Sequence, residues 1–148
     1  MTKKTQTVAQ EILNVIPLVM RKINTELRQK KFHTKNPTLS PAHYSILCII
    51  SKHPCTQREL IVKQAVSPPS MSNSIQVLVK NGWIQRTRER QDRRYVWLEL
   101  TAVGQKVLEE TDENIAKIVA SLSVDECNQV HAGLAVLYKH FSQAGEKR

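Results

Sequence analysis

The sequence contains few cysteines and no long apolar run, and each shortage excludes a class of protein. Its three cysteines are an odd number and lie far apart, except for Cys48 and Cys55, so they do not look like a disulfide framework. No apolar run approaches the length of a membrane span. The first lysines of the chain are not followed by an uninterrupted apolar stretch, so we expect no secretory signal and no membrane partner. The expected location is cytoplasmic.

The signatures of common enzyme sites are also missing. The sequence contains no glycine-rich phosphate loop, no nucleophile elbow and no paired metal motif. Cys127 and His131 are four residues apart, which is a spacing that metals can use. Two such residues without a partner pair favour ordinary core and surface positions. We therefore expect no enzyme activity, no metal and no cofactor.

Apolar residues and positive charge are what the sequence does have. Hydrophobic residues make up 41% of the 148 positions, which is enough for one globular domain with an apolar core. The formal net charge is +9. Residues 1–39 carry eight Lys/Arg against two Asp/Glu, whereas residues 102–148 carry five against seven. This balance favours a nucleic acid or another anionic surface as a partner.

Helical periodicity marks both ends of the chain. Residues 8–30 carry apolar side chains at steps of three and four and predict a long helix, which Pro17 is expected to kink. From Thr101 onward the pattern predicts two helices, separated by a capping box over 123–126. The apolar stripe of the first of these comprises Val103, Val107, Leu108, Ile115, Ile118, Val119 and Leu122. That of the last helix comprises Cys127, Val130, Leu134, Leu137 and Phe141, at heptad-like spacing.

Three shorter helices and a hairpin are predicted between these ends. A polar linker over 31–39 comes first, and a serine followed by a proline then opens helices over 40–52 and 67–81. A Thr-Gln-Arg-Glu capping box opens a short helix between them. The period then changes, because residues 83–87 and 95–100 are short, rich in β-formers and partly alternating. They predict a hairpin with an almost entirely charged tip.

A helix with small polar side chains near its start, beside an arginine-rich hairpin, favours duplex DNA as the partner. The major groove admits one helix, and the helix start adds backbone donors and a positive dipole for phosphate. The helix candidates are Ser70, Ser72, Asn73, Ser74 and Gln76. The hairpin can lie along the backbone or enter the narrow minor groove, which attracts arginine. Its candidates are Arg88, Arg90, Arg93 and Arg94, with Asp92 at the tip.

Structural roles compete with functional ones at several positions. The arginines could belong to a solvated turn, and the serines could be cap or surface residues. Cys48 fits a small core residue, whereas Cys55 follows a proline in a turn, where it could be exposed and sense redox state. His33 and His43 could titrate or line a pocket, although a lone histidine usually does neither.

Three segments together carry a family resemblance. They are Leu78-Val-Lys-Asn-Gly82-Trp-Ile84-Gln-Arg86, Asp92-Arg93-Arg94 and Leu100-Thr101-Ala-Val-Gly104. They resemble the MarR family of bacterial regulators, whose pattern has a leucine, a glycine and an arginine after the reading helix. Asp-x-Arg then follows in the wing, and Leu-Thr-x-x-Gly enters a dimer helix. The resemblance covers residues 40–104, and the outer helices match only in length and apolar character.

The resemblance implies a dimer that is joined by the first and last two helices and binds a near-palindromic operator. It implies that Asp92 holds the wing arginines and that Arg94 reaches the minor groove. It also implies an aromatic or phenolic effector between the dimer helices and the DNA-binding lobe. Peroxide-sensing members keep a reactive cysteine in the first helix, and the first 47 residues here contain none. Consecutive prolines, Pro68 and Pro69, are not demanded by the family pattern.

The sequence therefore predicts a mainly α-helical, winged helix-turn-helix protein with a small β-hairpin wing and long N- and C-terminal dimerisation helices. It predicts a single domain over 1–148, with a DNA-binding lobe over 38–100 and a helical dimerisation region over 8–34 and 101–148. The predicted function is a homodimeric, sequence-specific DNA-binding transcriptional regulator, a repressor released by a small aromatic or phenolic ligand. The alternative is a winged-helix antirepressor or adaptor that binds protein instead of DNA.

Overall fold

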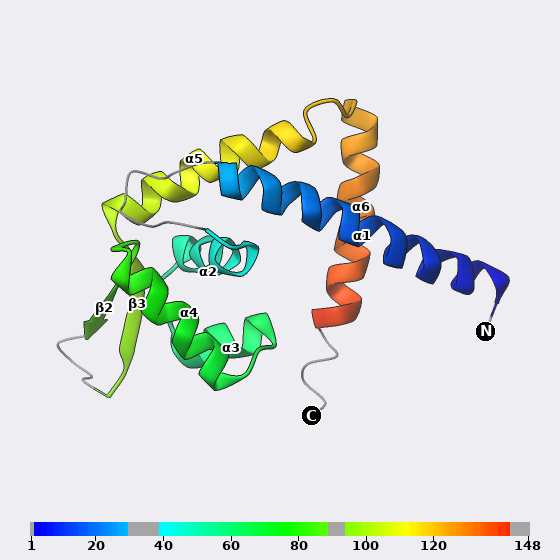
Figure 1. The fold of residues 1–148 in the computed structure, drawn as a ribbon. Coiled ribbons are helices and arrows are strands. Elements are labelled where there is room, and N and C mark those ends of the chain that lie inside the picture. Colours follow the sequence, from blue (N-terminus) through cyan, green and yellow to red (C-terminus); the bar gives the residue numbers. More distant parts are fainter. Residues whose placement is uncertain (1, 30–38, 89–93, 143–148) are drawn as a thin grey trace.

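The structure is a computed structural model that describes residues 2–29, 39–88 and 94–142. Its elements are, in order, α1 (Lys3–Gln29), α2 (Pro41–Lys52), β1 (Cys55–Thr56), α3 (Gln57–Gln64), α4 (Pro68–Lys80), β2 (Ile84–Arg88), β3 (Val96–Leu100), α5 (Ala102–Ile118) and α6 (Val124–Ser142). Figure 1 shows α2, α3, α4 and the sheet gathered in one lobe. The helices α1 and α5 lie along one side of this lobe, and α6 turns away from it. The predicted mainly α-helical fold with a small β-hairpin is confirmed.

Hydroxyl side chains set where the helices begin. The N-caps, whose oxygens accept a backbone N–H three residues further on, are Ser40, Thr56, Ser67 and Thr101. Glu59 completes the capping box at the start of α3, because its Oε2 atom accepts the N–H of Thr56 over 2.6 Å. The box over 123–126 forms in the same way, with Glu126 accepting the N–H of Ser123 over 2.7 Å. The predicted starts of α2, α3, α4, α5 and α6 are therefore confirmed.

The first helix and the segment after it differ from their predictions. The helix α1 begins at Lys3 rather than near residue 8. It continues through Pro17, which agrees with the expectation that this proline does not break the helix. Residues 31–38 of the predicted linker lie outside the described residues. Leu39, the last residue of that linker, is only 1% exposed and belongs to the core. Leu39 has no apolar neighbour at helical or strand spacing within this polar segment, so the pattern gave no sign of its burial.

A two-residue strand that the sequence did not predict completes the sheet. Strand β1 pairs antiparallel with β3, where Cys55 lies opposite Leu98, and the strand order is β1-β3-β2. The predicted hairpin of β2 and β3 is confirmed. Because Cys55 is fully buried, the expectation that it is exposed in a turn is wrong. Two residues are too few to show a period of two, so packing against β3 rather than local propensity places this strand.

One apolar core joins the lobe to the ends of α1 and α5. Its buried residues are Leu27, Leu39, Ile46, Leu47, Ile50, Cys55, Leu60, Met71, Ile75, Leu78, Trp83, Ile84, Leu98, Val107 and Leu108. The predicted stripe of α5 needs two corrections. Val103 is 48% exposed, and the neighbouring Gly104 is buried instead. Val119 is 45% exposed and, like Leu122, lies beyond Ile118, where α5 ends. The core is continuous from α4 through the sheet to α5, so close packing fixes α4 and the sheet against α5.

Hydrogen bonds at two places along α5 fix it against the lobe. The hydroxyl of Thr101, at the start of α5, donates to the carbonyl oxygen of Gly82 over 2.5 Å. The backbone N–H of Thr101 donates to the carbonyl oxygen of Trp83 over 3.1 Å. Further along, the hydroxyl of Tyr44 on α2 donates to Asp112 Oδ1 on α5 over 2.5 Å. The start of α5 is therefore bonded to the turn before the hairpin, and a later turn of α5 is bonded to α2.

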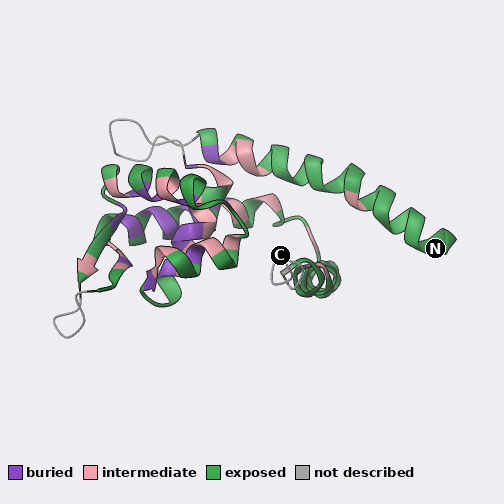
Figure 2. Ribbon diagram, turned by 90° about the horizontal axis from the view of Figure 1, so that it is seen from below, coloured by how far each residue is buried: buried purple, intermediate pink, exposed green. Residues whose placement is uncertain are grey.

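The helices α1 and α6 leave most of their apolar side chains uncovered. Both helices are exposed along most of their length. Figure 2 shows α1 extending well beyond the buried core, with almost all of this part exposed. The exposed large apolar residues of α1 are Val8, Leu13, Val15, Ile16, Leu18, Val19 and Met20, and those of α6 are Val124, Val130, Leu134, Val136, Tyr138 and Phe141. A groove of about 470 Å³, lined almost wholly by apolar residues, runs between the two helices.

Candidate nucleic-acid interface

The helices α3 and α4 form a helix-turn-helix pair whose second helix presents a polar row to solvent. The chain leaves α3 at Ala65, which adopts the left-handed conformation with φ of 51° and turns toward α4. The predicted apolar face of α4 is confirmed, because Met71, Ile75 and Leu78 are buried. Burial of that face orients the opposite face of α4 outward.

The residues predicted to contact DNA from α4 divide into two groups. Ser70, Asn73 and Gln76 are exposed, and their steps of three place them along one side of the helix. Ser72 and Ser74 are half-buried. The structure therefore brings the first three together as an outward row and places the two remaining serines on its flanks.

Ser72 has a partner on the preceding helix. Its Oγ atom accepts a hydrogen bond of 2.7 Å from Nε2 of Gln57, the first residue of α3. This bond links the start of α3 to the first turns of α4 and helps to fix the angle between the two helices. Sequence reasoning missed Gln57, because no periodic pattern connects two residues that are 15 positions apart.

The start of α4 offers fewer backbone donors than the sequence analysis expected. Pro68 and Pro69 occupy the first two helical positions and have no N–H. The N–H of Ser70 donates to the hydroxyl of Ser67 over 3.4 Å, and that of Met71 donates to the carbonyl oxygen of Ser67 over 3.0 Å. The expectation that backbone amides of this turn bind phosphate is therefore wrong for these four positions. Side chains are therefore the main donors that this turn offers to an anion.

The predicted wing residues are only partly described. Arg88 is exposed at the end of β2, and Arg94 is exposed in the turn before β3. Arg90, Asp92 and Arg93 lie outside the described residues. Arg86 is also exposed on β2, two positions before Arg88, and was not among the predicted site residues. The period of two within a strand was the signal that could have grouped Arg86 with Arg88.

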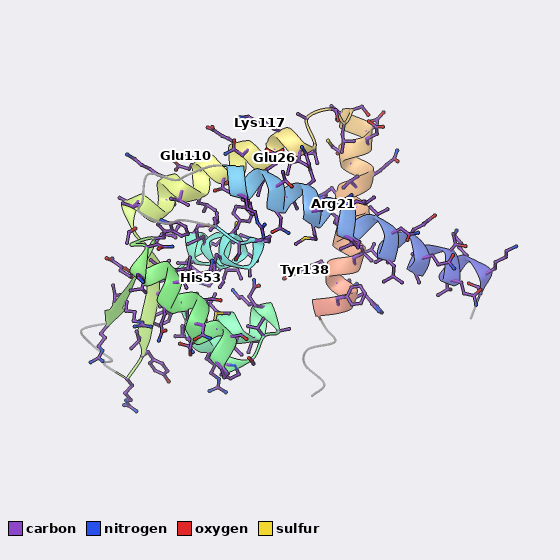
Figure 3. The ribbon with its side chains drawn as sticks, viewed as in Figure 1. Arg21, Glu26, His53, Glu110, Lys117 and Tyr138 are labelled. Atoms are coloured by element: carbon purple, nitrogen blue, oxygen red, sulfur yellow. The ribbon has the colours of Figure 1, made fainter. Side chains whose placement is uncertain are left out.

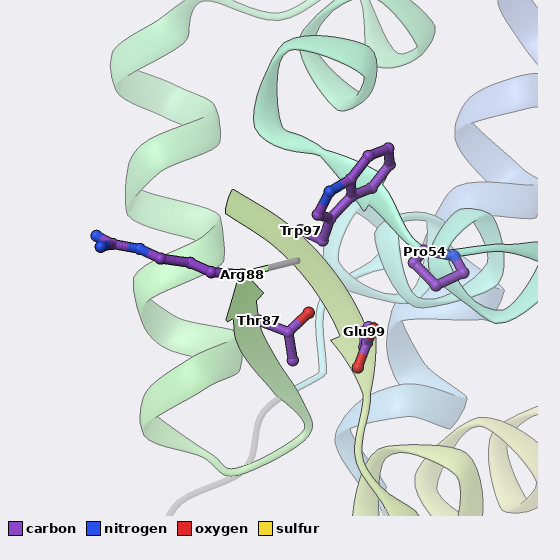
Figure 4. Close-up of a pocket in the computed structure, with 5 residues that line it drawn as sticks. All are labelled: Pro54, Thr87, Arg88, Trp97 and Glu99. Atoms are coloured by element: carbon purple, nitrogen blue, oxygen red, sulfur yellow. The ribbon is translucent and has the colours of Figure 1, made fainter. Parts of the chain in front are cut away.

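A shallow pocket of about 340 Å³ lies beside the hairpin (Figure 4). It is lined by Thr87 and Arg88 of β2, Trp97 and Glu99 of β3, and Pro54 just before β1. Figure 4 shows the Arg88 side chain pointing away from the other four residues. The guanidinium of Arg88 therefore extends the basic surface of the wing outward rather than filling this pocket.

Comparisons with known proteins agree with this geometry. A family model described as the MarR family matches residues 38–94. The chain is 31% identical over 100 residues to the HTH-type transcriptional regulator BilQ of Clostridium symbiosum, over 65% of this chain and 69% of BilQ. It is 29% identical over 131 residues to the uncharacterized HTH-type transcriptional regulator YpoP of Bacillus subtilis, over 88% of this chain and 91% of YpoP.

The chain belongs to the MarR family. The predicted family is thereby confirmed, and this MarR-family chain is a DNA-binding, helix-turn-helix transcriptional regulator rather than an enzyme. The crystal structure of Streptococcus pneumoniae FabT in complex with DNA has the same fold, with a TM-score of 0.74 and 24% identity over 95% of this chain and 99% of FabT. The predicted winged helix architecture is therefore confirmed.

The buried titratable groups of this MarR-family regulator favour their uncharged forms. Burial raises the pKa of the thiols of both Cys48 and Cys55 above the ordinary value of 9.0. Reactive cysteines need the thiolate, so both positions favour structural roles over redox sensing. Burial also lowers the pKa of His43 below 6.5, which keeps its imidazole neutral near pH 7. Cys127 on α6 is exposed.

A second pocket lies between the lobe and α6. It has a volume of about 350 Å³ and is lined by Ser45, Cys48, Ile49, Lys52, Lys63, Gln64 and Tyr138. Figure 3 shows Tyr138 on the side of α6 that faces α2 and α3. Gln64 donates a hydrogen bond of 2.7 Å to the Ser45 hydroxyl and closes the wall between α2 and α3. An aromatic ring and two lysines therefore border the same cavity.

None of the helices in the described part of the chain has the length and apolar character of a membrane span. Within residues 2–29, 39–88 and 94–142, no three His, Cys, Asp or Glu side chains gather as a group that could hold a metal ion.

Proposed function

We propose that this MarR-family chain is a homodimeric repressor that binds a near-palindromic operator and is released by a small aromatic or phenolic ligand. The observation that carries the proposal is the exposed polar row of α4 lying in the same lobe as the arginine-bearing hairpin. The polar row of α4 can enter a major groove while the arginines of the hairpin reach the phosphate backbone or the minor groove.

The proposed contacts follow from exposure and chemistry. Ser70, Asn73 and Gln76 contact base edges, whereas the half-buried Ser72 and Ser74 support the helix or contact phosphate. The wing contacts are assigned to Arg88, Arg90, Arg93 and Arg94, with Asp92 holding the tip. FabT, which shares this fold, has been solved in complex with DNA, and that supports the proposed partner.

The proposed dimer covers the apolar faces of α1 and α6. A second copy supplies a matching apolar surface by two-fold symmetry, so each of the two helices can bury its stripe without an unrelated partner. Exposed apolar residues along most of two helices exceed the scattered exposure that is normal on a monomer. A two-fold dimer also presents two copies of α4, which is what a near-palindromic operator requires.

The proposed effector site is the pocket between α2, α3 and α6. Its volume of about 350 Å³ falls at the small end of the usual range for ligand pockets. Tyr138 offers an aromatic face, and Lys52 and Lys63 offer positive charge for a carboxylate or phenolate. A ligand held here would contact both the lobe and α6. It could therefore change the angle between the two copies of the lobe in the dimer.

Salt dependence of binding tests the proposed function against the alternative of a protein-binding antirepressor or adaptor. Fluorescence anisotropy with labelled duplex DNA should show the logarithm of affinity falling linearly with the logarithm of salt concentration, because arginine contacts displace counterions from phosphates. The expected slope is about four to eight units in magnitude if each protomer neutralises a few phosphates. A flat response would exclude the repressor and favour the adaptor.

A further inference from the structure

The solvent-facing side of α4 carries amides and a valine but no charged side chain in the first three turns of the helix. Between Pro68 and Val79 the helix contains no Asp, Glu, Lys or Arg. This side comprises the outward row of Ser70, Asn73 and Gln76, together with the exposed Val77 and, at the last position of the helix, Lys80. Val77 is 40% exposed and follows Asn73 by four positions, so the two side chains are neighbours on one face.

The edges of the four bases discriminate between such side chains. In the major groove adenine offers N7 and N6–H₂, which fit the amide of Asn or Gln in two hydrogen bonds, and thymine offers a methyl group to apolar side chains. Guanine is paired best by Arg or Lys, and cytosine by Asp or Glu. Because these four residue types are missing from the first three turns of α4, a G·C pair finds no strong partner there.

Lys80 lies too far along the helix to change this preference. Reading helices contact base edges mainly with their N-terminal residues. Lys80 follows Asn73 by seven positions, which is about 10 Å along the axis. That displacement suits a phosphate at the edge of the groove.

We propose that α4 reads A·T base pairs, with Asn73 on an adenine, Val77 on the methyl group of a neighbouring thymine and Gln76 as a second amide contact. This inference rests on the proposed function, since it requires α4 to enter the major groove. It gives the solvent-exposed Val77 a partner that buries it. Ser70, whose hydroxyl can bond to any base, adds little discrimination.

Selection of bound sites from a random duplex library by the full-length protein tests the base preference. We expect each half-site to contain adjacent A·T pairs at the positions where Asn73→Ala relaxes the selection and weakens binding about tenfold. Invariant G·C pairs at those positions would overturn the A·T assignment and leave the proposed function intact. Enrichment of no sequence by the wild-type protein would overturn the proposed function itself.

Replacement of single thymines by uracil in a selected site tests Val77, because uracil lacks only the methyl group. At one position in each half-site the wild-type protein should lose affinity about fourfold, the effect of one apolar carbon taken out of contact. Val77→Ser should bind the thymine and uracil sites almost equally. The control is Val62→Ser, at a 66% exposed valine on α3, which should discriminate as the wild type does. Discrimination retained by Val77→Ser would refute the contact, and circular dichroism verifies that each variant is folded.

Discussion

Gly104 lies so close to Trp83 that no side chain fits between them. A Cβ atom on Gly104 would lie 1.9 Å from the carbonyl oxygen of Trp83 and 2.8 Å from its carbonyl carbon. Both are backbone atoms, and the same carbonyl oxygen accepts the N–H of Thr101 over 3.1 Å. The glycine that ends the Leu-Thr-x-x-Gly motif thus lets the first turn of α5 rest directly on the start of the hairpin.

Gly104→Ala should destabilise the protein strongly. The new methyl group meets backbone rather than the end of a flexible side chain, so α5 or the hairpin must shift and the core between them must open. We expect the free energy of unfolding to fall by about 3 kcal/mol or more, measured by urea denaturation. DNA affinity should fall as well, because the hairpin carries the wing.

Gly82→Ala provides the comparison, because it adds the same methyl group where no heavy atom lies within 4 Å. Gly82 has a φ of +72°, so alanine there is strained only by its backbone conformation. The cost should be about 1–2 kcal/mol, and Gly82→Asn should cost less, because asparagine tolerates the left-handed region. Equal losses for Gly82→Ala and Gly104→Ala would show that steric exclusion by Trp83 is not the reason for a glycine at 104.

The parts of the fold that were predictable from the sequence are those set by local chemistry. A hydroxyl three residues before a carboxylate specifies the start of α3, and the spacing of Met71, Ile75 and Leu78 specifies which face of α4 is buried. Each signal involves residues within one or two helical turns, where backbone geometry fixes the distance between side chains. The outward row of α4 could be predicted for the same reason.

Features that depend on packing between distant segments were not predictable. Strand β1 exists because Cys55 meets Leu98, and Ser72 is oriented by Gln57 on another helix. Burial of Leu39 likewise depends on the core formed by other elements. No short-range pattern encodes such contacts, because they appear only once the chain has folded. The half-buried state of Ser72 and Ser74 among the candidate residues of α4 was missed for the same reason.

The capping boxes at Glu59 and Glu126 make the stability of the protein depend on pH. Hydrogen bonds from the backbone and hydroxyl of Thr56 hold the pKa of Glu59 below its ordinary value of 4.5, and Ser123 lowers the pKa of Glu126 in the same way. A carboxyl group whose pKa is lower in the folded than in the unfolded protein stabilises the fold fully when the pH is above its unfolded-state pKa. That stabilisation is lost as the pH falls through its folded-state pKa.

The double variant Glu59→Gln/Glu126→Gln tests this dependence. Glutamine can still accept the capping hydrogen bonds but does not titrate, so the variant should be somewhat less stable than wild type near neutral pH. On acidification from about pH 5 to about pH 3 the wild type should lose more stability than the variant, and the two curves should converge. The measurement is thermal denaturation of both proteins over this pH range. If the melting temperatures of the wild type and the variant fell in parallel, these carboxylates would not contribute to the acid sensitivity.

Leu134→Glu should separate the proposed dimer. Leu134 is 53% exposed on α6 and lines the apolar groove between α1 and α6, where a second copy would bury it. A carboxylate in a desolvated apolar interface is costly, so the variant should scatter light as a 16.9 kDa protomer while the wild type scatters at twice that mass. Binding to a palindromic operator should weaken with the loss of the second α4.

Val62→Glu is the matched control for the dimer experiment. Val62 is 66% exposed on α3 and does not line the groove, so this variant should keep the wild-type mass. A wild-type protein that is monomeric at micromolar concentration would exclude the dimer and the palindromic operator together. If Leu134→Glu remained dimeric, the interface would have to lie elsewhere on the protein.

Arg94→Ala should weaken operator binding with little change in stability. Arg94 is exposed in the turn before β3, and the MarR-family pattern implies that it reaches the minor groove, where the narrow floor attracts arginine. Loss of one groove contact should reduce the binding free energy by about 1–3 kcal/mol. The free energy of unfolding, measured by urea denaturation, should remain close to that of the wild type, because removal of an exposed side chain creates no cavity. A large loss of stability would indicate a structural role instead.

Asp92→Ala decides what the acid at the wing tip does. Asp92 is the single acid among residues 90–94, and an acid that merely lies near phosphate is repelled by it, so its removal should tighten binding. If the carboxylate instead accepts hydrogen bonds from a neighbouring arginine and from turn amides, its removal should loosen the tip. We expect the second effect to win and binding to weaken, although the net charge has become more favourable. Operator titrations at one fixed salt concentration measure the sign, and tighter binding would refute the proposed role of Asp92.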